Sequence, residues 1–296
     1  MSNFELVTYK SVSGNVGDDF SEWLFKKALG SRIQKGGNTL LFGVGSILSK
    51  HFDDEFRKSC DQNCVVFGSG ARGPAHLPDT SRGAWKFYCV RGPLTASLMR
   101  LDPKLAMSDP AILAPLLIPA KEIPKRYVGI VPYYTASEDA WEKVAKRLGW
   151  KVISPHLQIE QFVAELSSCT SVWCESMHGA IFADAYRIPW RPISGTSLPS
   201  EGRTHAFKWT DWCSSVGLSF DPMHSFSFGK AGDSAYLGGK KIIKASILAN
   251  RLEKEKKLDR HQLSELSVLQ SRQEQLIEAL QKMSWEQTGR SLEVHF

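Results

Sequence analysis

Short apolar runs alternate with amphipathic, helix-like segments along most of the chain. Residues 6–9, 39–42, 64–67 and 87–90 have the length and composition of buried strands, and residues 127–131, 151–154 and 171–174 repeat the pattern. Apolar residues at helical spacing predict helices over residues 19–29, 93–99, 137–148 and 159–166. Strands that alternate with helices predict parallel α/β sheets.

A proline-rich stretch, residues 115–124, divides the two sets of predicted strands. We therefore expect a boundary near residue 122, between two Rossmann-like domains, 1–122 and 123–235, that face each other across a cleft. A helical tail, 236–296, follows.

The tail has no proline between about residue 240 and residue 283, and its first half is rich in lysine and arginine. Its apolar residues fit the a and d positions of heptads, with Gln273 as an interruption: Leu266, Leu269, Leu276, Leu280 and Met283. We interpret it as one long helix with a solvated face that packs on the body. Self-association through the tail and docking on an anionic membrane surface remain alternatives.

Composition excludes several classes of protein. The net charge of +6 is mild, and no basic block is interleaved with aromatic residues, so nucleic acid is not an expected partner. The N-terminus lacks the pattern of a secretory signal, and no apolar run is long enough to span a membrane. The six cysteines form no CxxC pair, which favours reduced thiols in a cytoplasmic protein. Cys60 and Cys64 lack a second ligand pair, so no metal site is expected.

The stretch CESMHGAIFADAYRIP, residues 174–189, joins a predicted strand to a helix. A helix that begins near Ser176 or Gly179 leaves its first backbone N–H groups unpaired, and such groups attract anions. Because ligands of open α/β sheets bind at the carboxyl ends of the strands, Ser176 and His178 should lie where a phosphate or carboxylate binds. His178 can donate to that anion or transfer a proton near neutral pH. Helix capping is the alternative for this histidine, and we favour the functional role.

Three glycine-rich turns follow strands of the first set. GNVGDD, residues 14–19, precedes a helix, and its glycines permit close approach of the backbone to a ligand. Asp18 and Asp19 in this turn can bind sugar hydroxyls, provide a general base, or cap the helix. The sequence leaves these roles open. GVGS, residues 43–46, and GSGARG, residues 68–73, are expected at the same edge of the sheet.

Two arginines also follow predicted strands. Arg72 lies in the GSGARG turn and can face the cleft. Arg91 directly follows a strand, where its guanidinium can bind a carboxylate or phosphate through two hydrogen bonds. A surface ion pair is an equally good explanation for Arg91.

Three further residues have weaker functional signals or a structural one. His156 follows a strand and is a weaker candidate than His178. Lys208 can reach an anion from an aromatic segment, residues 205–213, that we expect to pack between the domains. Asp109, in SDPAIL, is interpreted as structural rather than catalytic.

Taken in order, GNVGDD, FGVGS, VFGSGARG, VRGPLTA, SDPAIL and ESMHGAIFA resemble motifs of the polysaccharide pyruvyl transferase family. The resemblance covers residues 5–215 and is greatest to members that act on bacterial exopolysaccharides. It implies a fold similar to GT-B glycosyltransferases and transfer of a pyruvyl group from phosphoenolpyruvate to a sugar, often as a cyclic ketal. The implied partner is a sugar or a lipid-linked oligosaccharide, with peripheral membrane contact as an option. Phosphoenolpyruvate is a co-substrate, and no cofactor is implied.

The resemblance also implies roles for individual residues. The donor-site histidine of the family matches His178, which we expect to protonate the methylene carbon of the donor. Some members carry an arginine two residues earlier, where this chain has Ser176. The donor side would therefore be completed by the helix start and by cationic side chains: Ser176, Gly179, Arg91, Arg72 and Lys208. Asp18 or Asp19 would be the base, and the acceptor side would comprise Asn15, Gly17, Gly45, Gly70 and His156.

Two other functions remain open from the sequence. A GT-B glycosyltransferase that uses a nucleotide sugar would share the cleft and the anion site. A non-catalytic assembly protein of a polysaccharide pathway would bind partners through the tail. That protein would tolerate His178→Ala and fail when the tail is truncated.

Overall fold

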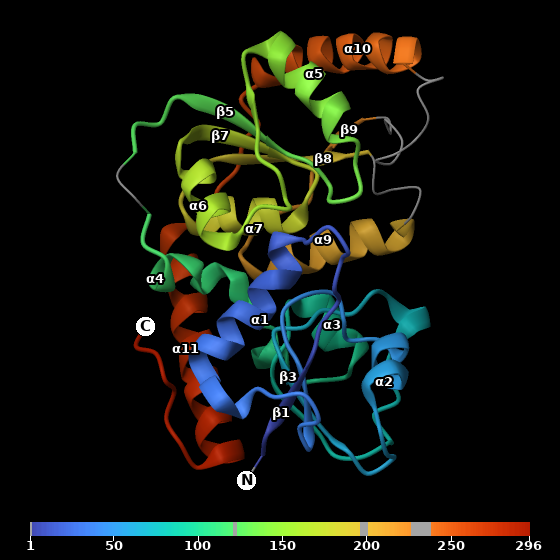
Figure 1. Cartoon of the computed structure of the whole chain (residues 1–296), viewed down its shortest axis with the longest axis vertical. Helices are drawn as coiled ribbons and strands as arrows, with labels where there is room; N and C mark the ends of the chain where they lie inside the picture. The colour runs from blue at the N-terminus through green and yellow to red at the C-terminus, as the bar shows by residue number, and fades with distance from the viewer. Residues whose placement is uncertain (1, 121–122, 196–200, 226–237) are drawn as a thin grey trace.

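Two parallel β-sheets lie one above the other, with helices between them (Figure 1). The computed structural model describes residues 2–120, 123–195, 201–225 and 238–296. The first sheet has the strand order β1-β2-β3-β4, and its strands are β1 (Phe4–Val7), β2 (Thr39–Phe42), β3 (Asn63–Phe67) and β4 (Trp85–Cys89). The second has the order β6-β5-β7-β8-β9, and its strands are β5 (Tyr127–Val131), β6 (Lys151–Val152), β7 (Cys169–Cys174), β8 (Trp190–Ser194) and β9 (Met223–His224).

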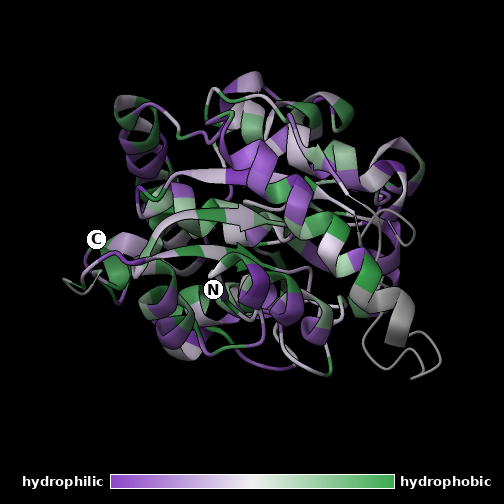
Figure 2. Ribbon diagram, turned by 90° about the horizontal axis from the view of Figure 1, so that it is seen from above, coloured by the Kyte–Doolittle hydropathy of each residue, from purple (hydrophilic) through white to green (hydrophobic). Residues whose placement is uncertain are grey.

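Helices cover both sheets and fill the space between them (Figures 1 and 2). The α-helices are α1 (Val16–Leu29), α2 (Lys50–Phe56), α3 (Pro93–Leu98), α4 (Ala114–Leu117), α5 (Glu138–Leu148), α6 (Ile159–Ser167), α7 (Met177–Ala185), α9 (Arg203–Ser215), α10 (Gly238–Lys256) and α11 (Leu266–Thr288). Short 3-10 helices are η1 (Gly30–Arg32), η2 (Pro74–His76), η3 (Pro103–Leu105) and η4 (Pro110–Leu113). None of the described helices has the length and apolar composition needed to cross a membrane.

The parallel α/β arrangement predicted from the sequence is confirmed. All four residues of β2 are buried, as expected for a parallel strand covered on both faces. Among the strands and α-helices, sequence reasoning missed α2, α4, β8, α9 and β9. The sequence of β8 lacks the apolar pattern of a buried strand, because it contains Arg191 and Pro192 although all five of its residues are buried. The division at residue 122 and the GT-B likeness stay predictions.

The helices α1 and α7 bring the two halves of the chain together. Phe20 of α1 contacts Phe182 of α7 edge to face, with ring centroids 5.3 Å apart. Both rings belong to a hydrophobic cluster that includes Phe67 of β3 and Trp190 of β8. Because α1 and α7 each follow a strand of their own sheet, this packing brings the two carboxyl edges together.

The single long helix expected for the tail is wrong, because the tail forms two helices with a break at residues 257–265. Within the break, Asp259 has a positive φ of 46°. The backbone of Gln262 exchanges two hydrogen bonds with Trp190, at 3.1 and 2.9 Å, and this extended pairing is incompatible with a continuous helix.

The apolar face of the tail packs on the body, as we favoured from the sequence. Leu269, Leu276, Leu280 and Met283 are buried in the same cluster as the strands, whereas Leu266 is 51% exposed. Gln273, the interruption in the heptads, donates from Nε2 to the carbonyl of Ile112 at 2.8 Å. This apolar stripe is therefore buried by contacts with the rest of the same chain. Self-association through other parts of the tail stays a prediction.

Candidate functional site

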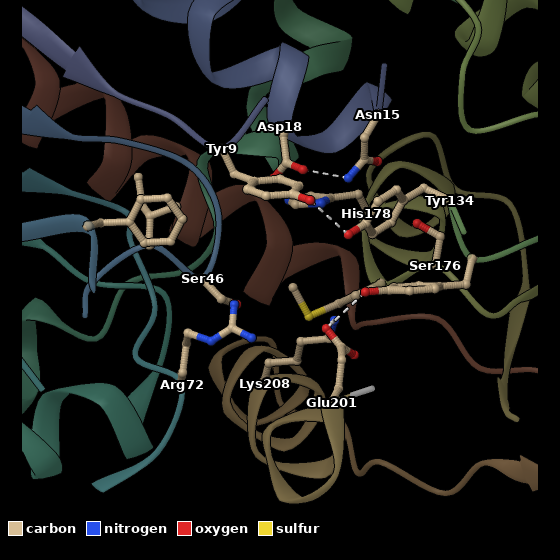
Figure 3. Close-up of a pocket in the computed structure, with 14 residues that line it drawn as sticks. Tyr9, Asn15, Asp18, Ser46, Arg72, Tyr134, Ser176, His178, Glu201 and Lys208 are labelled. Atoms are coloured by element: carbon tan, nitrogen blue, oxygen red, sulfur yellow. Dashed lines mark hydrogen bonds and ion pairs between the residues drawn. The ribbon is translucent and has the colours of Figure 1, made fainter. Parts of the chain in front are cut away.

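A cavity of about 240 Å³ lies where the carboxyl ends of both sheets meet (Figure 3). Each of five strands delivers a lining residue shortly after it ends: Tyr9 after β1, Ser46 after β2, Arg72 after β3, Tyr133 after β5 and His178 after β7. Glu201 and Lys208 close the cavity from α9 and the residues before it. This is the position at which open parallel sheets bind their ligands.

Six of the residues predicted from the sequence line the cavity together. These are Asn15, Asp18, Arg72, Ser176, His178 and Lys208. The predicted residues that do not line it are Gly17, Asp19, Gly45, Gly70, Arg91, His156 and Gly179.

His178 is the second residue of α7 and is 7% exposed. Ser176 caps this helix, because its Oγ accepts the Gly179 N–H at 3.4 Å. The first turn of α7 thus lies at the cavity, with its backbone N–H groups and the His178 ring.

Asp109 lies behind His178, a neighbour that sequence reasoning missed. Its Oδ2 is 3.6 Å from Nε2 of His178, and both atoms are buried without a hydrogen bond to any described residue. Its Oδ1 accepts the Ala111 N–H at 3.0 Å and so caps η4. The structural role expected for Asp109 is confirmed, and the same carboxylate also faces the imidazole. A carboxylate in this position favours the tautomer that carries its proton on Nε2 and leaves Nδ1 for the cavity side.

Gly17 lies directly against the His178 ring. A Cβ atom added to Gly17 would come within 3.0 Å of three His178 side-chain atoms, Nδ1 among them. The residue therefore serves close packing between α1 and α7. Gly70 does the same for Arg91, because its added Cβ would meet the guanidinium.

The two aspartates of GNVGDD have different surroundings. Asp19 is exposed, and its Oδ2 accepts the backbone N–H of Asn15 at 3.1 Å, which is a capping contact at the start of α1. Asp18 faces the cavity and accepts from the Asn15 amide at 2.6 Å. Burial raises the pKa of Asp18 to about 6, although His178 and Asn15 oppose part of this shift. A carboxyl with such a pKa is suited to proton transfer near neutral pH.

The cationic side chains differ in whether they have partners. Lys208 donates to Glu201 at 2.6 Å. Burial lowers the pKa of Lys208, and Lys208 together with His205 overcomes burial to lower the pKa of Glu201 to about 2. Arg72 forms no ion pair or side-chain hydrogen bond with any residue in the described parts of the chain, and its guanidinium points into the cavity (Figure 3). It is thus available to an anionic ligand.

Arg91 forms an ion pair, one of the two explanations offered from the sequence, but the pair is buried rather than at the surface. Its Nε donates to Asp211 at 3.1 Å, and its other nitrogens donate to Ser46 Oγ at 2.6 Å and to the Ala71 carbonyl at 3.2 Å. These three hydrogen bonds keep the guanidinium out of the cavity lining, and Ser46 is the lining residue to which it donates.

His156 lies outside the cavity and fixes the GNVGDD turn. Its Nδ1 is 2.8 Å from the Gly14 carbonyl, and its Nε2 is 3.9 Å from Glu138. It therefore joins the first turn of the chain to the second sheet.

Tyrosines form a wall of the cavity that sequence reasoning missed. The Tyr9 and Tyr134 hydroxyls are 3.2 Å apart, and the Tyr133 hydroxyl donates to Glu201 at 3.1 Å (Figure 3). The available signal was the position of the Tyr133–Tyr134 pair two residues after a strand. Phenol hydroxyls at a cavity wall can bind the hydroxyls of a sugar.

The described residues contain no group of three or more histidine, cysteine, aspartate or glutamate side chains arranged to hold a metal ion. The cavity combines a cation without a partner, a helix start, a buried imidazole and a carboxyl with a raised pKa. Together these groups can bind a small anion and move protons next to it.

Comparison with known proteins gives a consistent result. A model of the polysaccharide pyruvyl transferase family matches residues 9–197. The chain is 32% identical over 217 residues to the succinoglycan biosynthesis protein ExoV of Rhizobium meliloti, which covers 72% of this chain and 65% of that protein. It is 25% identical over 225 residues to the uncharacterized protein L143 of Acanthamoeba polyphaga mimivirus, which covers 70% of this chain and 72% of that protein. No solved structure matches the chain. Since the family model spans more than half of the chain and includes the helix start that carries His178, the chain belongs to the polysaccharide pyruvyl transferase family.

Proposed function

We propose that this protein transfers a pyruvyl group from phosphoenolpyruvate to a sugar of an exopolysaccharide or its precursor and forms a ketal. The observation that carries the proposal is a single cavity lined by His178, backed by Asp109, and by Arg72, whose side chain has no ion-pair or hydrogen-bond partner in the described chain. A donor with a carboxylate and a phosphate needs such a cation, and its double bond needs an acid. Membership of the family and the likeness to a succinoglycan biosynthesis protein support this choice.

The reaction requires two new C–O bonds. The π electrons of the donor take a proton at the methylene carbon, which becomes a methyl group. A sugar hydroxyl oxygen attacks the neighbouring carbon, the bond from that carbon to the phosphate oxygen breaks, and a second hydroxyl of the same sugar closes the ring. Of the two hydroxyl protons, one balances the proton on the methyl group and the other leaves with inorganic phosphate.

The cavity residues match these steps. Nδ1 of the protonated His178 ring delivers the proton, while Asp109 holds Nε2 and stabilises the ring cation at 3.6 Å. Asp18, with a pKa of about 6, accepts a proton from the sugar. Arg72 and the first N–H groups of α7 stabilise the charge on the phosphate as it leaves.

The proposal also includes a fold, an acceptor with its location, and the cofactor requirement. The two sheets would form the two Rossmann-like domains of a GT-B-like fold, divided near residue 122. The acceptor would be a free or lipid-linked saccharide, reached in the cytoplasm, where phosphoenolpyruvate is made. The reaction as written needs no metal or cofactor.

The test is release of phosphate from phosphoenolpyruvate with galactose, glucose and mannose acceptors. We expect release that depends on an acceptor and is lost in His178→Ala, with His295→Ala as a control because His295 is exposed and outside the cavity. Wild-type protein that releases no phosphate but binds a nucleotide sugar would favour the glycosyltransferase alternative. Full activity in His178→Ala would contradict the mechanism.

A further inference from the structure

A second hollow, of about 590 Å³, opens beside the cavity. Tyr9, Phe52 and Arg72 line both spaces, so the hollow adjoins the cavity at these side chains. Tyr9 and Arg72 lie at the edge of the cavity that faces the first sheet (Figure 3). The rest of the hollow is formed by the first turn of α2 and by η2.

The cavity itself is too small for a whole acceptor. Its 240 Å³ is below the range of about 300–1,000 Å³ that pockets for drug-sized ligands occupy. The donor and the reacting sugar must share this space. The saccharide beyond the reacting unit has to leave the cavity, and the hollow is the adjoining space that can receive it.

Most of the ionisable side chains in the wall of the hollow are basic. Lys50 and Arg72 form no ion pair within the described parts of the chain. The carboxylate in the wall, Asp54, is neutralised by Arg82 at 2.7 Å. The exposed histidines of the wall are His51, which is 3.5 Å from Glu55, and His76. A ligand group placed here meets Lys50 and Arg72, which form no ion pair with a described carboxylate, although Asp79 lies near enough to Lys50 for their charges to interact.

We propose that the hollow binds an acidic group on the acceptor, carried by the sugar unit next to the one that reacts. This inference rests on the proposed function, because it assumes a saccharide acceptor in the cavity. Lys50 supplies a charge specific to the hollow, and Arg72 lies at the junction with the donor. Tyr9 and Phe52 provide the apolar wall against which the ring of the connecting sugar lies.

The test compares two disaccharide acceptors with the same reacting unit. One carries glucose as its second unit and the other carries glucuronic acid. We expect kcat/KM for phosphate release to be about fivefold higher with the acidic disaccharide, the factor that a partly exposed ion pair contributes, and to decline with added salt. Lys50→Ala should bring the ratio close to one, whereas Lys50→Arg and the remote, exposed Lys104→Ala should keep it.

The outcomes separate this inference from the proposed function. Equal kcat/KM values for the two disaccharides in the wild type, or an unchanged ratio in Lys50→Ala, would overturn the acidic subsite while transfer itself stands. If neither disaccharide supports phosphate release, the proposed function fails. Calorimetric titration of each disaccharide into wild type and Lys50→Ala then decides the subsite, since only tighter binding of the acidic disaccharide that depends on Lys50 supports it.

Discussion

Replacing Gly17 with alanine tests whether packing of α1 against α7 sets the position of the His178 ring. The added methyl group would lie closer than 3.0 Å to the ring, so the imidazole has to move. Overpacking of this kind costs about 1–3 kcal/mol, whereas alanine gains about 1 kcal/mol over glycine in a helix. We expect a net loss of no more than about 2 kcal/mol in the free energy of unfolding. A misplacement of about 1 Å at a reacting group can lower the rate about 100-fold. Activity should therefore fall far more than stability.

A double-mutant cycle isolates the contact. In a His178→Ala background the ring is absent and only the contact with Cβ of residue 178, at 2.7 Å, remains, so Gly17→Ala should cost less than it does in the wild type. Urea denaturation of the four proteins gives the coupling free energy, expected at about 1–3 kcal/mol. Phosphate release measured on the single variant reports the displaced ring. Additive effects on stability, or Gly17→Ala with wild-type kcat, would refute the reasoning.

Four further predictions concern the cavity and the tail. Asp109→Asn keeps an acceptor for the Ala111 N–H but offers its amide to Nε2 of His178, which favours the other tautomer. We expect kcat to fall at least about 100-fold, since a wrong tautomer costs about 10⁴-fold in serine proteases, and the nitrogen-15 shifts of the ring report the change. Arg72→Ala should raise KM for phosphoenolpyruvate by about tenfold or more, as expected for hydrogen bonds to a charged group, and unchanged titration of the donor would argue against this role. Because the pKa of Asp18 is raised from 3.8 to about 6, the folded state holds this proton more tightly, and stability falls as the pH rises through that window. The free energy of unfolding of Asp18→Asn, measured with urea between about pH 4 and about pH 7, should fall by up to about 3 kcal/mol less than that of the wild type. The same pH dependence in both proteins would contradict this prediction. Leu276→Ala, in the buried stripe of α11, should cost about 2–5 kcal/mol in the same assay, whereas a loss below about 0.5 kcal/mol would indicate a removable tail.

The fold was predictable where one local pattern determined the element. β2 and β5 coincide with their predicted residues, because short apolar runs bounded by polar turns have few alternatives. The break in the tail was not predictable in this way. Gln262 leaves the helix to pair with Trp190, which stands about seventy positions earlier, and no proline or glycine marks the change. Tertiary pairing overrode a favourable local helix pattern.

The candidate site was predictable in its location and only partly in its members. Topology alone places the residues after parallel strands at one edge, which is why Asp18, Arg72 and His178 meet. Asp109 was missed as a neighbour of His178 because it was interpreted as structural, which its capping of η4 agrees with. A carboxylate has two oxygens, and the second one faces the imidazole.

Arg72 and Arg91 show why the partner of a side chain, and not its place in the motif, decides its role. Both follow strands of the first sheet and both looked equally able to bind an anion. Asp211, on a helix 120 positions later, pairs with Arg91 and removes it from the cavity, whereas Arg72 has no carboxylate partner in the described chain. The anion site thus depends on which arginine the fold leaves unmatched. Replacing Asp211 with asparagine should weaken its interaction with Arg91. It should not turn Arg91 into a second anion-binding residue of the cavity, because Ser46 and the Ala71 carbonyl still accept hydrogen bonds from the guanidinium.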